Sequence, residues 1–282
     1  MSAQPGQVLP LVRPAPARTT ASANAPVLIE GRGVSKTYRT REGDVETLKP
    51  LDFQIRAGEF VSVVGPSGCG KSTLMKMVAG LLPISGGELL LSGQSVRGPQ
   101  TNVGIVFQSA LLLPWRSVLD NILLQAEIRN MPRAAARGRA AQLLEMAGLK
   151  GFENKYPWQL SGGMQQRVAI LRALLHDPPV LLMDEPFGAL DAMTREKMNL
   201  ELQRIWMAAG KTVLLITHSI PEAIFLSDRV FVMSERPGSI AAVYDIDLPR
   251  PRPLDVMGTE RFASYAKTLR AHFFAQGNLD AH

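Results

Sequence analysis

The segment GPSGCGKST, at residues 65–73, constrains the fold of this chain more than any other stretch of its sequence. It fits the pattern G-x-x-x-x-G-K-[ST] and lies between an apolar, strand-like run, EFVSVV at 59–64, and a helical pattern. Glycines at these spacings let successive backbone N–H groups point at one anion, and the helix that follows adds its positive dipole end. The sequence therefore predicts a strand, a phosphate-binding loop and a helix in direct succession.

The whole loop is expected to surround the phosphates of a nucleotide. Its residues are Gly65, Pro66, Ser67, Gly68, Cys69, Gly70, Lys71, Ser72 and Thr73. The ammonium group of Lys71 would reach the β- and γ-phosphate oxygens, and the hydroxyl of Ser72 would bind Mg²⁺. Thr73 would lie close to the α-phosphate. The loop alone does not distinguish an ATPase from a GTPase or a small-molecule kinase.

Two carboxylates end a second apolar run, VLLMDEP at 180–186. Asp184 is expected to hold the shell of a Mg²⁺ ion, and Glu185 to act as the general base that polarises the attacking water. Ordinary acids that face water at the end of a strand would give the same local pattern. The phosphate loop upstream favours the catalytic interpretation. A kinase would not need a second carboxylate for water, so the pair favours hydrolysis.

Strands and helices alternate along most of the chain. Short β-type runs at 27–38, 51–55 and 59–65 make a strand-rich opening, and helical patterns then alternate with apolar strands. Such alternation is typical of an α/β fold, in which helices cover both faces of a parallel sheet. A helix-dominated span from about 115 to 175 interrupts the alternation. We expect this span to form a subdomain of its own.

The two ends of the chain differ from its middle. Residues 1–26 are rich in proline and alanine and contain no acid, so they are expected to form a disordered tail. Residues 27–245 would form the ATPase domain, and 246–282 a Pro-punctuated linker followed by an amphipathic helix. The apolar face of that helix would contain Phe262, Tyr265, Leu269 and Phe273. Packing onto the domain is the expected use of this face, and a membrane or partner contact is the alternative.

Composition excludes several classes of protein. No apolar run approaches the ~18 residues that cross a bilayer, so a role at a membrane needs a partner. The Lys and Arg residues are scattered and the net charge is +6, so no nucleic-acid partner is expected. The single cysteine, Cys69, excludes an internal disulfide framework. Because Cys69 precedes a predicted helix, we expect it to alkylate readily and ATP to protect it.

A third motif, LSGGMQQR at 160–167, is a Ser-Gly-Gly loop that enters a helix. It resembles the signature sequence of ATP-binding cassette (ABC) ATPases, and the other motifs of that family follow in its order. They are Tyr38, the loop at 65–73, Gln108, the signature at 160–164, Asp184 with Glu185, GALD at 188–191, and His218. Met164 stands where the commonest spelling of the signature has glutamine. The part that would meet phosphate, at 161–163, is intact.

This resemblance implies the fold and its cofactors. The family has a P-loop NTPase (RecA-like) core, an antiparallel β subdomain and an inserted α-helical subdomain, here at about 109–175. ATP and Mg²⁺ are the implied cofactors. The catalytic residues would be Glu185, His218, Gln108 and Lys71. The metal would be held by Ser72, Gln108 and Asp184.

The resemblance also assigns roles at the nucleotide. Tyr38 would stack on adenine, although a surface tyrosine at a strand corner is the alternative. His218 would contact the γ-phosphate and hold the water geometry together with Glu185. Gln108, at the end of the strand VGIVFQ, would reach the Mg²⁺ ion and the water.

The signature segment implies a dimer. Ser161 and the amides of Gly162 and Gly163 would form a second anion site at a helix N-terminus. In the family, the signature of one cassette closes over the nucleotide that the other cassette binds. The active form would therefore be a head-to-tail dimer of two copies with two ATP molecules between them. Asp191 would also lie at that interface and act in trans.

Finer resemblance narrows the function. The segments LLPWRSVLDN at 112–121, 183–206 and MSERPGSI at 233–240 are similar to those of nitrate, sulfonate and taurine importer ATPases. The resemblance implies a peripheral subunit, on the cytoplasmic face of the inner membrane, that drives uptake of a small anion through a separate permease. A periplasmic or extracellular solute-binding protein would deliver the anion. The alternatives are import of bicarbonate or a pyrimidine precursor, and a regulatory ATPase that acts on a soluble partner.

The apolar segment after Gln108 is a candidate docking site for the permease. Leu111, Pro114 and Trp115 would receive a cytoplasmic helix of the permease, because an aromatic side chain on a kinked, loop-like segment suits a docking surface. The alternative is that this segment belongs to the core of the helical subdomain.

Overall fold

The structure is a computed structural model that describes residues 24–275. Residues 1–23 of the expected tail and residues 276–282 lie outside the described residues. Its central sheet has the order β10-β9-β3-β8-β7-β6, and every neighbouring pair is parallel except β10 with β9. The strands are β3 (Phe60–Val64), β6 (Val103–Val106), β7 (Val180–Asp184), β8 (Thr212–Ile216), β9 (Arg229–Met233) and β10 (Ile240–Asp245).

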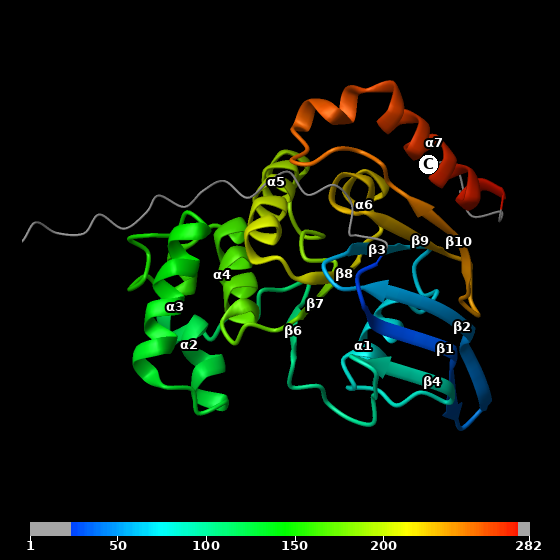
Figure 1. Ribbon diagram of the computed structural model, residues 1–282, viewed down its shortest axis with the longest axis horizontal. Coiled ribbons are helices and arrows are strands. Elements are labelled where there is room, and N and C mark those ends of the chain that lie inside the picture. The colour runs from blue at the N-terminus through cyan, green and yellow to red at the C-terminus, as the bar shows by residue number, and fades with distance from the viewer. Residues whose placement is uncertain (1–23, 276–282) are drawn as a thin grey trace, which may run out of the picture.

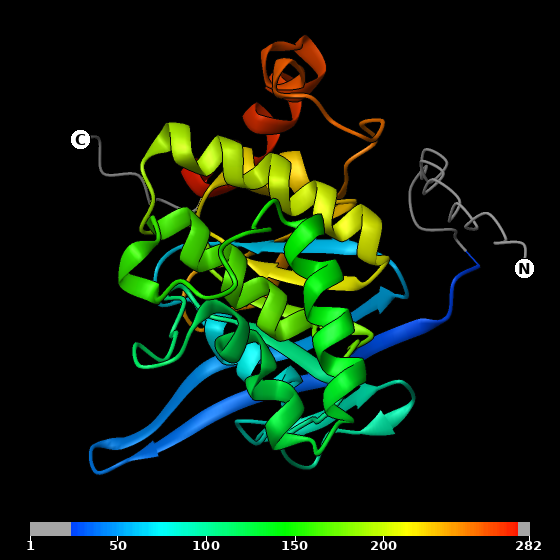
Figure 2. The same cartoon turned by 90° about the vertical axis from the view of Figure 1, so that its left-hand side faces the viewer.

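A second, antiparallel sheet has the order β2-β1-β4-β5. Its strands are β1 (Val27–Thr40), β2 (Gly43–Arg56), β4 (Gly86–Leu91) and β5 (Gln94–Ser95). The first two form a long hairpin that projects from the rest of the molecule (Figure 2). The sequence patterns predict only parts of this hairpin and neither of the short strands β4 and β5, which pair with β1 and with each other.

Alternate residues of the parallel strands enter two separate hydrophobic cores. In β3, Phe60 and Val64 pack on the side of the large helices, whereas Val61 and Val63 face α1 (Lys71–Val78) and the antiparallel sheet. The same alternation continues in β7, β8 and β9. The parallel sheet is therefore covered on both faces, as predicted.

Three helices form an arm beside the parallel sheet, on the side away from the antiparallel sheet (Figure 1). They are α2 (Val118–Ile128), α3 (Arg133–Met146) and α4 (Gly162–Leu174), within the span predicted to be helical. Serine side chains cap two of them, since Ser117 accepts from Asp120 N at 3.1 Å and Ser161 from Met164 N at 3.3 Å. No helix in residues 24–275 is long and apolar enough to cross a membrane.

The segment expected to be a linker is packed into the core and holds two buried arginines. Arg252 is 1% exposed, and its Nη1 donates to the carbonyls of Ile224, Phe225 and Ser227 at 2.7–2.9 Å. These carbonyls end α6 (Ile220–Leu226), where a cation is favourable. Burial lowers the pKa of Arg252 to about 9, so the group stays charged at neutral pH.

Arg250 makes a second buried contact. Its Nη2 lies 2.9 Å from Asp228 Oδ1, and its guanidinium carbon lies 4.4 Å from the ring centroid of Trp206 on α5 (Ala192–Ala209). The other carboxylate oxygen of Asp228 accepts from the N–H of Phe60 at 2.9 Å, at the start of β3. Arg250 therefore joins this segment to the central strand through one carboxylate.

The C-terminal helix α7 (Glu260–Ala275) follows a short 3₁₀ turn, η2 (Leu254–Gly258), and packs on α6. Phe262 and Leu269 of the predicted apolar face are buried in the main core. The hydroxyl of Tyr265 accepts from the N–H of Asp247 at 3.1 Å. The side chain of Phe273 lies outside the described part of the chain. The described part of this face thus packs onto the domain.

We predict that Arg252→Met lowers the free energy of unfolding by about 3 kcal/mol or more, because several buried carbonyls lose their donor. The matched control is Arg270→Met on the exposed side of α7, which should change that free energy by less than about 0.5 kcal/mol. Urea unfolding followed by circular dichroism measures both. Equal unfolding midpoints for the two variants would contradict the structural role of Arg252.

Candidate functional site

The predicted loop at 65–73 connects the buried strand β3 to α1. Gly68 and Gly70 have φ angles of 77° and 104°, in the region that favours glycine. A Cβ atom at Gly70 would lie 2.5 Å from Leu48 Cδ2, so space also requires glycine there. Among the described residues, no side chain caps the N-terminus of α1. The first N–H groups of this helix are therefore available to an anion.

Lys71 folds back over this loop. Its side chain is 6% exposed, and Nζ donates to the carbonyls of Gly65 and Pro66 at 2.8 Å each. No carboxylate within residues 24–275 forms an ion pair with this ammonium group. A phosphate would supply the missing negative charge.

Two side chains with oxygen atoms meet where β7 ends and α1 begins. Ser72 Oγ donates to Asp184 Oδ1 at 2.9 Å. Burial raises the pKa of Asp184, and the neighbouring charge of Glu185 adds to that rise. A hydroxyl and a carboxylate suit Mg²⁺, which usually takes one or two carboxylates together with phosphate oxygens. The described residues contain no cluster of three or more His, Cys, Asp or Glu side chains that could hold a metal without such help.

Three further polar side chains converge beside this pair. Glu185 Oε2 lies 3.2 Å from His218 Nδ1. A Cβ atom at Gly188 would lie 3.0 Å from Gln108 Nε2 and 3.4 Å from Glu185 Oε2, so glycine leaves room for their approach. Glu185 itself has a φ of 45°, a rare conformation for a residue with a side chain. The structure thus brings Gln108, Glu185 and His218 together, next to Asp184.

The signature segment lies elsewhere in the same chain. Gly162 and Gly163 begin α4, and Cβ atoms there would lie 3.5 Å from Leu190 Cδ2 and 3.3 Å from Met198 Sδ. Asp191 caps α5 by accepting from Thr194 N at 3.0 Å, and hydrogen bonds from the side chain and the backbone of Thr194 lower the pKa of its carboxyl. The segment at 161–163 thus packs against the start of α5. Within the described residues, no hydrogen bond joins it to the phosphate loop.

Tyr38 lies near the end of β1 on the antiparallel sheet, opposite Val45. Its side chain is 37% exposed, and the ammonium group of Lys36 lies 5.1 Å from the ring centroid. The aromatic ring is therefore accessible, and a cation already lies over it. No ligand contact follows from this position, so its role with adenine stays a prediction.

The structure contradicts the expectation that Cys69 alkylates readily. The residue is 1% exposed, and burial raises the pKa of its thiol. The N–H groups and the ammonium of Lys71 oppose that rise without outweighing it. A buried thiol with a raised pKa reacts slowly, because the thiolate is the nucleophile.

Sequence reasoning missed two polar residues that hold the chain on either side of Gln108. From α4, Gln166 Nε2 donates to Phe107 O at 3.0 Å, and Arg172 donates to the carbonyls of Ala110 and Leu111 at 2.8 Å each. Gln166 is 3% exposed. The sequence does contain a signal for Gln166, because this glutamine interrupts an otherwise apolar face of the helix.

Comparisons with known proteins place the chain in a family. The ABC transporter family model matches residues 48–188. The taurine import ATP-binding protein TauB of Rhizobium johnstonii is 48% identical over 73% of this chain and 79% of its own length. The aliphatic sulfonates import ATP-binding protein SsuB of Bacillus cereus is 45% identical over 78% of this chain and 86% of its own.

A solved structure is similar as well. It is the dimeric post-hydrolysis state of an ATP-binding cassette bound to ADP and Pi. It has a TM-score of 0.66 and 34% identity, over 78% of this chain and 99% of its own. These likenesses confirm the predicted α/β, P-loop NTPase fold. With the family match and relatives at this level of identity, the chain belongs to the ABC transporter family.

Proposed function

We propose that this chain is the ATP-hydrolysing subunit of a bacterial importer, which drives uptake of a small anion such as a sulfonate, taurine or nitrate through a separate permease. The observation that carries the proposal is the approach of Glu185 and His218, at 3.2 Å, beside Asp184 and the phosphate loop. Relatives named for the import of taurine and aliphatic sulfonates support the choice of cargo.

The geometry supports hydrolysis of ATP. Lys71 and the first N–H groups of α1 would hold the β- and γ-phosphates. Ser72, Asp184 and Gln108 would hold Mg²⁺, which neutralises charge that develops on the phosphates. Glu185 would accept a proton from the attacking water, and His218 would orient that carboxylate.

A second copy of the chain would complete each site. Ser161, Gly162, Gly163 and Asp191 lie at the N-termini of α4 and α5, apart from the phosphate loop of their own chain. In a head-to-tail dimer these residues would reach the nucleotide of the partner. The dimeric cassette bound to ADP and Pi supports this arrangement. Tyr38 would stack on the adenine.

The permease would dock beside Leu111 and Trp115, which are 57% and 71% exposed, with Pro114 between them. The fully buried side chain of Asn121 fixes this segment, because it accepts a hydrogen bond from the N–H of Leu113 and donates one to the carbonyl of Leu113. The exposed apolar side chains are thus held on a rigid base, as docking requires.

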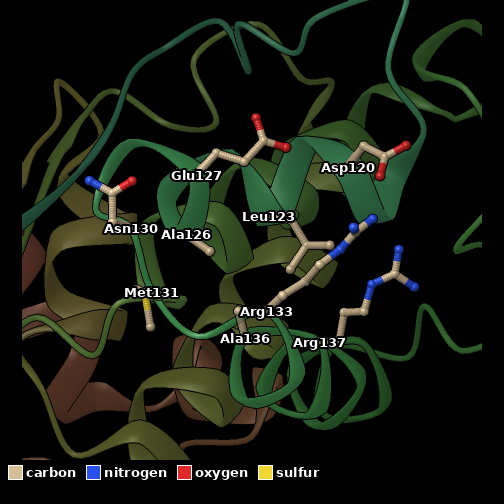
Figure 3. A pocket seen from close by; sticks show the side chains of 9 residues that line it. All are labelled: Asp120, Leu123, Ala126, Glu127, Asn130, Met131, Arg133, Ala136 and Arg137. Carbon is tan, nitrogen blue, oxygen red and sulfur yellow. The ribbon is translucent and has the colours of Figure 1, made fainter.

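A pocket of about 390 Å³ lies between α2 and α3. Asp120 and Glu127 line one wall, and Arg133 and Arg137 line the other (Figure 3). Arg116, next to Trp115 in the sequence, bonds Glu127 at 2.7 Å and so connects pocket and segment. A permease helix with polar ends would extend from the exposed apolar segment into this pocket. A subunit docked on its permease in this way would lie peripherally, on the cytoplasmic face of the inner membrane.

Co-purification with a multi-span permease tests transport against regulation. The reconstituted complex, supplied with a periplasmic or extracellular solute-binding protein, should hydrolyse ATP faster when its solute is added. Taurine, sulfonates, nitrate, bicarbonate and a pyrimidine precursor are compared in turn. Stable association with a soluble protein instead, and no stimulation by any solute, would favour a regulatory ATPase.

We predict that Glu185→Gln binds Mg-ATP normally but hydrolyses it at least about 100-fold more slowly, because the base for water is lost. The variant should accumulate as an ATP-dependent dimer in size-exclusion chromatography. Glu196→Gln, an exposed carboxyl on α5, is the control and should keep wild-type turnover. Turnover close to wild type in Glu185→Gln would refute the assignment of the base.

We predict that Trp115→Ala reduces solute-stimulated ATP hydrolysis and uptake about tenfold, because a docking contact is lost. Basal hydrolysis and ATP binding should change little. Val243→Ala, an exposed apolar side chain on β10, is the matched control. If the reconstituted complex with Trp115→Ala takes up solute at the wild-type rate, Trp115 is not a docking contact.

A further inference from the structure

His218 lies in the short turn between β8 and α6. Its side chain is 53% exposed, so packing contributes little to holding the imidazole against Glu185. The backbone of the turn at 217–219 must therefore set the direction of the ring. What holds that turn also controls the distance between the two side chains.

A closed set of hydrogen bonds holds this turn. Thr217 Oγ1 accepts from the N–H of Ser219 at 3.0 Å, and Ser219 Oγ accepts from the N–H of Glu222 at 3.3 Å. The hydroxyl of Thr217 then donates to Glu222 Oε2. The arrangement is like a capping box, except that the carboxylate meets Thr217 and not the N–H of the capping residue. His218 thus lies between two residues that are bonded to each other and to Glu222.

Glu222 differs from an ordinary helix-capping residue because it is buried. It is 3% exposed, and burial raises the pKa of its carboxyl. Its second oxygen, Oε1, has no hydrogen-bond partner among the described residues. Burying a carboxyl costs free energy that an exposed capping group does not require. The cap alone therefore does not account for this position.

We propose that Glu222 is a positioning residue that fixes the turn carrying His218 through its hydrogen bond with Thr217. The inference rests on the proposed role of His218 beside Glu185. Glu222 acts through Thr217 and the turn that Thr217 belongs to, so its loss should slow hydrolysis without weakening the binding of ATP.

Substitutions at two residues test this role. Thr217→Val keeps the side-chain shape without the hydroxyl and is expected to lower kcat about tenfold, with an unchanged KM for ATP. Glu222→Gln keeps an acceptor for Thr217 but replaces the carboxyl by an amide, which is a weaker acceptor than a carboxylate, and should lower kcat about threefold. Thr217→Ser retains the hydroxyl, and its kcat should equal that of the wild type. Glu196→Gln is again the exposed control, and melting temperatures show that each variant is folded.

A double-mutant cycle with His218→Ala decides whether the effect passes through His218. Adding Thr217→Val to His218→Ala should cost no further activity, because the positioned group is already absent. An additive cycle, or wild-type kcat in both Thr217→Val and Glu222→Gln, would overturn the proposal. Normal hydrolysis by His218→Ala would instead refute the role of His218 in the proposed function, and the inference would fall with it.

Discussion

Parallel pairing of β3, β8, β7 and β6 places the proposed catalytic groups along one edge of a sheet. Neighbouring parallel strands end on the same side, so the loop after β3, Asp184 after β7 and His218 after β8 meet although they are far apart in the sequence. The strands are buried on both faces. A slip in register would move each apolar side chain into the wrong core. The packing of the core therefore also fixes the geometry of the site.

Helix α4 connects this edge to the surface of the molecule. Its first turn is the signature segment, Gln166 bonds the carbonyl of Phe107, and Arg172 bonds the carbonyls of Ala110 and Leu111. A helix of this length is stiff. Any movement of α4 would thus displace the proposed anion site, the segment of Gln108 and the proposed docking residues together. This is the physical connection that coupling between hydrolysis and a membrane partner requires.

The parts predicted from the sequence are those that local patterns specify. The loop at 65–73 and the strand-ending pair Asp184 and Glu185 need only neighbouring residues to be identified. The burial of Cys69 could not be predicted, because the backbone of Gly238 packs on its carbonyl: a Cβ there would lie 2.0 Å from Cys69 O. The acceptors of Arg252 likewise belong to α6, and no spacing within its own segment indicates them. Contacts of this kind depend on the completed fold.

The two buried arginines have a consequence for where the folding unit ends. Arg250 neutralises the carboxylate of Asp228 that meets the start of β3, and Arg252 closes the end of α6. A fragment cut after β10 would lack both cations and would leave these groups buried without partners. The shortest fragment able to fold on its own therefore extends past Arg252. Grafting a different C-terminal helix onto this cassette would have to begin beyond that residue.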